Sequence, residues 1–239
     1  MDAAHPGNGP VTREKLIEAA GEIFAEKGLH GASIRDITQR AGANIAAVNY
    51  HFHDKFELYT LVLQQAHEGI LAALNQVVSA RTPEGRIRQL LSAMLSSALN
   101  PARPKWHTQL LGRELFQPTP ALDRLQDMLQ APVQRLREAV HELRPDLCPE
   151  HTMLTVCGIV AQCLFYVHHR HIVHRLFRTL PEPTSAALAD HVVAFSLAAL
   201  RALPVDRRHS RPRRRSAARG AIARSTARAS KRRSARSSH

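Results

Sequence analysis

Apolar residues near the start of the chain recur at helical spacing. From residue 12 to residue 27 they return every three or four positions, and the glutamates between them fall on other faces. The apolar positions are Leu16, Ile17, Ala20, Ile23 and Phe24. The pattern predicts an amphipathic helix that Thr12 can cap and that Gly28 can end in a left-handed conformation.

Two shorter helices are predicted next, with a glycine between them. Ser33 can cap the first helix, and an acid stands three residues later, as in a capping box. Gly42 can end this helix and Asn44 can cap the next one, in which Val48 and Phe52 share the inward face. Two short helices joined by a tight glycine turn predict a helix-turn-helix.

The rest of the pattern is also helical, and no stretch alternates as a strand would. Asp54 can cap a long helix over residues 55–79. Further helices, separated by prolines, are predicted over 83–99, 106–117, 121–143, 150–175 and 184–202. Pro132 should kink or split the one that contains it. We therefore expect an all-α protein.

The charge of the chain is concentrated at one end. The formal net charge is +13, and residues 204–239 hold 13 of the Lys and Arg residues against the single acid Asp206. This tail of Arg, Ser, Ala and Lys has too little apolar surface to offset chain entropy, so we expect it to be disordered. It can attach to DNA without sequence preference, or it can be a solvated extension with no role.

Four parts of the chain follow from these patterns. They are a disordered N-terminus at 1–11, a helix-turn-helix domain at 12–60, a second helical domain at 61–203 and the tail at 204–239. The first segment has no apolar core of signal-peptide length, and no run of about 18 apolar residues occurs, so neither export nor membrane spanning is expected. Cys148, Cys157 and Cys163 fit no C-x-x-C spacing, which favours reduced, buried thiols and a cytoplasmic protein.

The third predicted helix has the chemistry of a DNA-recognition helix. Ala46 and Ala47 are small enough to let the backbone approach base edges, and both can contact thymine methyl groups. Asn49 can bond a base edge. Nearby donors can reach phosphate oxygens, namely Tyr50, His51 and Lys55. The alternative is that Tyr50 and His51 only cap the core of a small helical bundle, as we expect for Phe52.

Three segments together resemble the N-terminal domain of TetR-family transcriptional regulators. They are T12-REKLIEAAGEIFAEKG, S33-IRDITQRAGA and N44-IAAVNYHFHDKFELY. The resemblance implies a dimeric repressor whose second domain binds a small ligand. It places Arg35, Ile45, Ala46, Ala47 and Asn49 near bases, and it places Ser33, Tyr50, His51 and Lys55 on phosphates, with Asn44 at the start of the same interface.

One departure from the family pattern matters for DNA reading. Many relatives carry polar residues at the positions of Ile45 and Ala46, and this chain does not. Direct hydrogen-bond readout is therefore limited, and more specificity is expected from Arg35, Asn49 and DNA shape. Acids and bases within residues 12–55 balance, so binding should depend on placed contacts and on doubling them in a dimer.

Residues 106–128 and 157–169 are similar to the C-terminal domain of the CecR-like branch of this family. A mixture of apolar and polar side chains in these segments suits a semi-polar ligand. The predicted ligand-binding residues are Trp106, Leu110, Arg113, Glu114, Gln162, Phe165, Tyr166 and His169. Alternatives stay open: Arg113 and Glu114 can form a salt bridge, and Phe165 can be a core residue.

A metal site, a cofactor and an enzymatic activity are not predicted. His168, His171 and His174 recur every third residue, but no Cys or carboxylate in the run completes a ligand set, so a solvated basic face or a surface near the dimer interface is favoured. The chain has no phosphate-binding loop and no G-x-S-x-G motif.

The last two helices carry more apolar residues than one buried stripe needs. The resemblance implies that they form a four-helix interface in a homodimer, which would present two recognition helices to a palindromic operator. A monomer with a thick core is the alternative. The expected function is a ligand-released repressor in which the long helix 55–79 transmits the ligand's effect. An architectural DNA-binding protein dominated by its basic tail is the second hypothesis.

Overall fold

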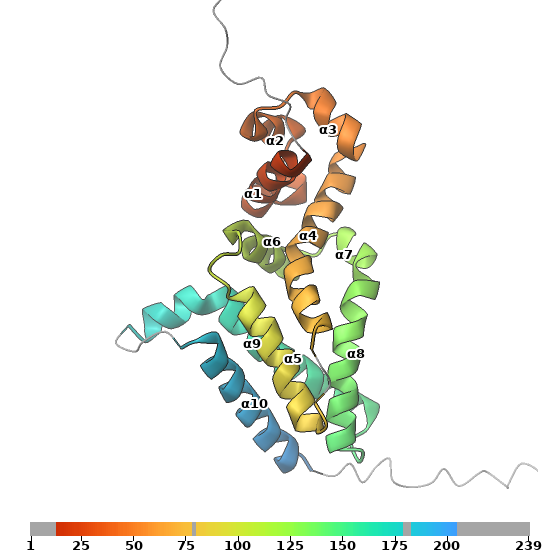
Figure 1. Cartoon of the computed structure of the whole chain (residues 1–239), viewed down its shortest axis with the longest axis vertical. Helices are drawn as coiled ribbons and strands as arrows, with labels where there is room; N and C mark the ends of the chain where they lie inside the picture. Colours follow the sequence, from red (N-terminus) through yellow and green to blue (C-terminus); the bar gives the residue numbers. More distant parts are fainter. Residues whose placement is uncertain (1–12, 78–79, 179–182, 205–239) are drawn as a thin grey trace, which may run out of the picture. The chain divides into compact units, whose positions relative to one another are not determined.

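The computed structural model describes residues 13–77, 80–178 and 183–204, and within these ranges it contains ten helices and no strand (Figure 1). The predicted all-α fold is therefore confirmed. The helices are α1 (Arg13–Gly31), α2 (Ile34–Ala41), α3 (Ile45–Phe52), α4 (Lys55–Asn75), α5 (Pro83–Ala98), α6 (Lys105–Phe116), α7 (Ala121–Arg124), α8 (Gln126–Leu143), α9 (Pro149–Leu176) and α10 (Ser185–Ala202). The Thr12 cap, the N-terminus and the tail predicted above lie outside the described residues.

Two of the predicted helices differ from the structure in detail. The predicted helix over 121–143 is divided into α7 and α8, and the break falls at Leu125 rather than at Pro132. Pro132 lies in the second turn of α8, where its missing N–H removes only one hydrogen bond near the start of the helix. In α9, the backbone of His169 leaves helical geometry, with φ −116° and ψ 15°, so the helix is kinked there.

The first of two hydrophobic cores lies around α1 and the first half of α4. Phe24 and Tyr59 meet edge to face in it, with ring centroids 4.9 Å apart. Besides α2 and α3, α6 and α7 contribute side chains to this core through Trp106, Leu110 and Ala121. The core therefore includes residues from both sides of the domain boundary predicted at residue 60.

The second core is formed by α5, α8, α9, α10 and the end of α4. Its fully buried members include Ile87 of α5, Val140 of α8, Cys163 of α9 and Val192 of α10. Helix α5 has contacts with α4, α8, α9 and α10, so it is the central helix of this core. Burial raises the pKa of the Cys163 thiol to about 12.

Large apolar side chains remain exposed on α9 and α10. They include Met153, Leu154, Phe165 and Phe195. By length and mean hydropathy alone, both helices could cross a membrane. Their opposite sides are buried in the second core, which is how the core helices of a folded domain behave. Cys157, predicted to be buried, is exposed because it lies on this outer side of α9.

Candidate functional site

Local hydrogen bonds set the ends of α2 and the start of α3. Ser33 and Asp36 form the predicted capping box: the Ser33 hydroxyl accepts from the Asp36 amide, and the Asp36 carboxylate accepts from the Ser33 amide, both at 3.1 Å. Gly42 adopts the left-handed conformation, with φ 65° and ψ 33°, which ends α2. The Asn44 side chain accepts from the Ala47 amide at 2.9 Å and caps α3. Gly42 and the Asn44 cap therefore set where α2 ends and where α3 starts.

Helix α3 has one buried side and one open side. Val48 and Phe52 are buried in the first core. On the open side, Ile45 is 53% exposed and Tyr50 is 82% exposed, and Ala46 and Asn49 are exposed beside them. A helix this short, held by a cap at its start and by two anchors beneath, presents a side of small and polar groups that a DNA major groove can admit.

Three of the other predicted DNA-binding residues have contacts of their own. Ala47 is half-buried against the first core. His51 is half-buried, and its ring meets that of Tyr50 at 5.0 Å between centroids. Lys55 is half-buried, and its Nζ donates to the carbonyl oxygen of Ala32 at 2.9 Å. An ammonium has three donors, so Lys55 keeps two for another acceptor.

Several cations near α3 are neutralised by carboxylates. Arg40 pairs with Glu22 at 2.5 Å and with Glu26 at 3.5 Å, and Lys27 pairs with Asp36 at 3.0 Å. The Lys27 hydrogen bond is the main reason why the pKa of Asp36 falls to about 2. Because these pairs cancel charge, the three-helix unit lacks a strong basic field of its own.

Two exposed arginines belong to the same three-helix unit. Arg35 is exposed on α2. Arg13 was not predicted as a site residue, and its guanidinium carbon lies 5.5 Å from the centroid of the Phe52 ring. This contact brings a cation from the start of α1 to the end of α3. No motif in the sequence indicated it, because it joins residues far apart along the chain.

The α6 residues predicted to bind a ligand lie where α6 packs on α1 and α4. Trp106 is 3% exposed and Leu110 is fully buried, both in the first core. A Cβ added to Gly21 of α1 would lie 2.5 Å from Trp106 ring carbons, so the indole covers that glycine directly. Arg113 donates to the carbonyl oxygens of Ala25 and Glu26 near the end of α1, at 3.2 and 2.8 Å.

Glu114 is a buried carboxylate, 2% exposed, whose bonds link α6 to α4. It accepts from the Tyr59 hydroxyl at 2.6 Å and from both the backbone amide and the hydroxyl of Thr119, at 2.7 and 2.9 Å. Burial, and then the bond to Glu114, raise the pKa of Tyr59. Arg113 and Glu114, considered above as a salt bridge, therefore bond to different helices.

The predicted ligand residues of α9 are spread over two surfaces. Gln162 donates to the Ser196 hydroxyl of α10 at 3.4 Å and lines a groove of about 360 Å³. Phe165 is exposed and stacks on His169, with ring centroids 5.2 Å apart. Tyr166 lines a larger cavity of about 680 Å³, within the size range of ligand pockets. The structure thus does not bring the α6 and α9 residues to one wall.

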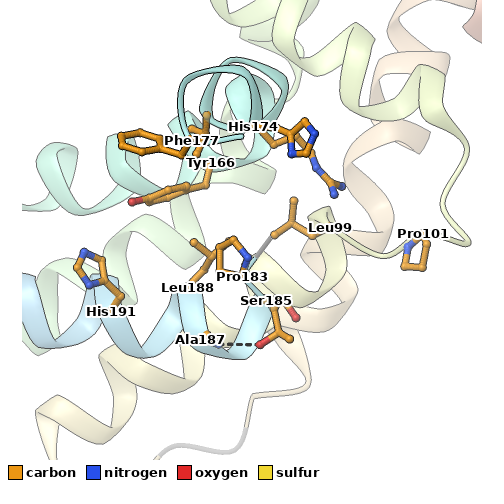
Figure 2. Close-up of a pocket in the computed structure, with 13 residues that line it drawn as sticks. Leu99, Pro101, Tyr166, His174, Phe177, Pro183, Ser185, Ala187, Leu188 and His191 are labelled. Atoms are coloured by element: carbon orange, nitrogen blue, oxygen red, sulfur yellow. Dashed lines mark hydrogen bonds between the residues drawn. The ribbon is translucent and has the colours of Figure 1, made fainter. Parts of the chain in front are cut away.

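Figure 2 shows the larger cavity between the end of α9 and the start of α10. Tyr166, His174 and Phe177 extend from α9, Leu188 and His191 from α10, and Leu99 and Pro101 from the segment after α5. Most of this lining is apolar, with imidazole and phenol groups interspersed. Of this set only Tyr166 was predicted, because the residues come from three separate segments.

The histidine run of α9 does not form the single solvated face that the sequence predicted. His171 and His174 are exposed, but His168 is half-buried beside Gly112 of α6, and burial lowers its pKa. The kink at His169 turns these residues away from a common face. Among the residues that the structure describes, no group of three or more His, Cys, Asp or Glu side chains is placed to hold a metal ion.

Comparison with known proteins gives a consistent result for both halves of the chain. Residues 16–62 match the family "Bacterial regulatory proteins, tetR family", and residues 83–200 match the C-terminal domain of the HTH-type transcriptional dual regulator CecR. The repressor NicS of Pseudomonas putida is 27% identical over 207 residues, which cover 80% of this chain and 92% of NicS.

Two further matches are shorter or more distant. The activator FasR of Mycolicibacterium smegmatis is 33% identical over 85 residues, which cover 36% of this chain and only 37% of FasR. A TetR-like regulator from Rhodococcus sp. RHA1 has a similar fold, with a TM-score of 0.62 at 15% identity, covering 80% of this chain and 96% of that protein. The relatives named here are regulators of transcription.

Proposed function

Since the chain belongs to the TetR family of bacterial regulatory proteins, with a C-terminal domain of the CecR type, we propose that it is a dimeric repressor that a small-molecule effector releases from a palindromic operator. The observation that carries the proposal is the open side of α3, whose small and polar groups lie above the buried anchors Val48 and Phe52. This arrangement suits insertion into a major groove. Such a regulator acts in the cytoplasm.

On this proposal, sequence is read by few side chains. Asn49 donates and accepts at a base edge, Ala46 and Ala47 contact thymine methyl groups, and Ile45 adds apolar contact. Arg35, exposed on α2, is the cation that reaches a base. Because the set offers few hydrogen bonds, we infer that DNA shape contributes part of the specificity.

Phosphate contacts fix the position of α3 in the groove. Tyr50 donates from the most exposed ring of the helix, and His51 donates beside it. Ser33 retains a hydroxyl proton, Asn44 retains its amide nitrogen, and Lys55 retains two donors after their contacts within the protein. These groups carry no base preference, so they set affinity rather than the choice of site.

A second copy of the chain is proposed to cover the outer sides of α9 and α10. The groove of about 360 Å³ between them is lined by Leu154 and Gly158 of α9 and by Phe195 and Ala199 of α10. Exposed apolar surface of this kind supports association of two copies about a two-fold axis. The axis would place two copies of α3 about 34 Å apart, one turn of DNA.

The effector is proposed to act through α6, because α6 is tied to the DNA-binding unit. Trp106 lies against α1, Arg113 bonds to the end of α1, and Glu114 bonds to Tyr59 of α4. We propose two conformations, which differ in the position of α6 and in the spacing of the two recognition helices. A ligand that binds one conformation more tightly shifts the equilibrium towards it, by an amount set by its difference in affinity. Of the predicted α9 residues, His169 would then border the effector, because its ring meets that of Phe116 of α6 at 5.8 Å between centroids. Gln162 and Tyr166 line other cavities, and Phe165 is exposed.

An architectural DNA-binding protein is the second candidate, because residues 204–239 carry most of the net charge of the chain. Counterion release at such a tail gives binding that depends strongly on salt and weakly on sequence. The two candidates differ in what happens when the tail is removed.

Selection of bound fragments from random DNA tests the proposal with the full chain and with residues 1–203. We expect both to enrich one palindromic sequence, and Asn49→Ala to change the enriched bases. Tyr50→Phe should weaken binding to all sequences about equally, by about fivefold, the loss of one hydrogen bond. Asn75→Ala, an exposed amide at the other end of α4, is the matched control and should change neither result.

Two outcomes would contradict the repressor proposal. Loss of all selectivity when the tail is removed would favour the architectural alternative. An unchanged sequence preference in Asn49→Ala would remove α3 from the role of reading helix.

A further inference from the structure

Arg103, in the segment between α5 and α6, is half-buried and pairs with no carboxylate of the described residues. Its Nη2 donates to the carbonyl oxygen of Ala66 in α4, and its Nε donates to Nδ1 of His107 at 3.2 Å. Its Nη1 is buried and has no hydrogen-bond partner. None of the ion pairs found among the described residues includes Arg103. Burial lowers its pKa, as expected for an uncompensated cation.

Two further buried donors adjoin this guanidinium. His107 accepts from Arg103 at Nδ1, so its ring proton is on Nε2, and Nε2 is buried without a partner. The indole Nε1 of Trp106 is also buried without a partner, and its ring meets that of His107 at 4.0 Å between centroids. Buried N–H groups of native proteins nearly always have an acceptor, so three together indicate that one is missing.

The start of α6 adds to the demand for an acceptor. Helix α6 begins at Lys105 behind Pro104, and no side chain caps it. Uncapped amide groups at a helix start favour an anion through both hydrogen bonds and the helix dipole. Arg103, Trp106 and His107 all lie within one turn of this start.

The charge of the missing group can be inferred from the charge of the cluster. Burial, and then the Arg103 charge, lower the pKa of His107 to about 4, so the imidazole is neutral near pH 7. The carboxylate of Glu114 is bonded to Tyr59 and Thr119 and does not pair with Arg103. The guanidinium therefore lacks a carboxylate partner, which a group with a single negative charge would supply.

We propose that Arg103, His107 and Trp106 bind a carboxylate of the effector, which makes the effector class an organic acid with an apolar body. The apolar body is inferred from the apolar character of the nearby side chains, among them Ala66 and Leu110. The inference rests on the proposed function, because it names the chemistry of the molecule that releases the DNA. The cluster also connects the effector to the DNA-binding unit, because Trp106 contacts α1 and Arg103 bonds to α4.

Trp106 is the single tryptophan of the chain, so its fluorescence reports on this cluster directly. The full-length protein is titrated with octanoate and benzoate, with the neutral amides octanamide and benzamide, and with inorganic phosphate. We expect both carboxylates to change Trp106 emission and to raise Tm at millimolar concentration. At least one of the amides should bind about tenfold more weakly than the carboxylate of the same shape. Phosphate should have a smaller effect than either carboxylate.

Arg103→Gln separates recognition of the anion from a purely structural role. We expect it to weaken carboxylate binding at least about tenfold and to abolish the preference over the amides. Without ligand its Tm should equal or exceed that of the wild type, because a buried unpaired charge is removed. Arg88→Gln is the matched control: Arg88 pairs with Asp190 at the surface, so the carboxylate titration should not change.

Several results would overturn the assignment. Equal binding of acid and amide would show that the donors bind a neutral group or water. An unchanged titration in Arg103→Gln would place the acid elsewhere, and a response to phosphate alone would exclude the carboxylate. None of these results affects selection of operator DNA, so each is distinguishable from failure of the proposed function.

Discussion

The two hydrophobic cores of this protein differ in how completely the chain covers them. The first core, around α1 and α4, receives α6 and α7 from later in the sequence, and its large side chains are buried. The second core buries one side of α9 and α10 and leaves Phe165 and Phe195 exposed on the other. The first core is therefore covered within one chain, and on the proposed dimer a second copy covers the outer side of the second core.

The two cores suit two different tasks, presentation of α3 to DNA and association of two copies. A unit that presents α3 to DNA needs a fixed geometry, which the buried anchors and the bonds from Arg113 and Glu114 provide. A surface that joins two copies needs uncovered apolar area. The effector cluster at Arg103 lies beside the first core, so an effector there acts on the rigid unit directly.

The largest expected effect comes from breaking the outer surface of the second core. Phe195 is 59% exposed on α10, so Phe195→Asp should leave the fold of one chain intact. A carboxylate in an apolar interface should weaken association by at least about a hundredfold. Sedimentation analysis should show monomers, and operator affinity should fall because the two contacts are no longer linked.

Val133→Asp is the matched control for this variant. Val133 is also exposed, but it lies on α8, away from the groove between α9 and α10. Val133→Asp should have the same mass in sedimentation analysis as the wild type. A Phe195→Asp protein that sediments like the wild type would mean that the second core does not need another copy at this surface.

A smaller but still clear loss is expected from overfilling the first core. In Gly21→Ala the new methyl carbon would lie 2.5 Å from the Trp106 ring, which is held in the core and cannot move aside easily. We expect a loss of about 2 kcal/mol in the free energy of unfolding. Chemical denaturation measures it, and the operator affinity of the folded fraction should fall as α6 shifts from α1.

Gly69→Ala serves as its control, because this glycine is also helical but is exposed, and its nearest neighbour would be 3.7 Å from an added Cβ. It should stabilise the protein by about 0.5–1 kcal/mol, the usual helix preference for alanine. Similar losses in both variants would show that Trp106 does not make the first core tight.

The local features of the fold were predictable because each depends on residues close in sequence. The Ser33 capping box, the left-handed Gly42 and the buried Val48 and Phe52 follow from spacing alone, and the structure confirms them. The break at Leu125 was not predicted. Proline is a strong local signal, but a helix break set by packing of α7 on α4 has no such signal.

The ligand residues show the limit of sequence reasoning most clearly. Trp106 and Glu114 were selected for their chemistry, but whether they face a cavity or another helix depends on tertiary packing. Arg103 was overlooked, because nothing near it in sequence reveals that its guanidinium will be buried without an acid. Unpartnered donors become visible only when the partners of every nearby side chain are known.

The smallest expected effect is a dependence of stability on pH that the first core should show. The folded-state pKa of His107 is about 4, below its ordinary value of 6.5, mainly because the ring is buried. As pH falls from about 6.5 towards 4, the unfolded chain binds a proton that the folded chain does not, so unfolding is favoured. Stability is therefore complete above pH 6.5 and is lost through this window.

His67 and His168, both half-buried, have pKa values lowered in the same direction, so they add to the slope. His107→Gln should remove the part of this pH-dependent loss of unfolding free energy that is due to His107, on the order of 1 kcal/mol after allowance for partial exposure. Denaturation series from pH 7.5 to 4.5, in buffers without carboxylate, measure the difference. Octanoate should reduce the slope of the wild type but not of His107→Gln, because an anion beside the imidazole favours its protonated form. The free energy of unfolding could instead depend on pH equally in the two proteins, with and without octanoate. That result would show that His107 does not stay neutral on folding and does not face the bound acid.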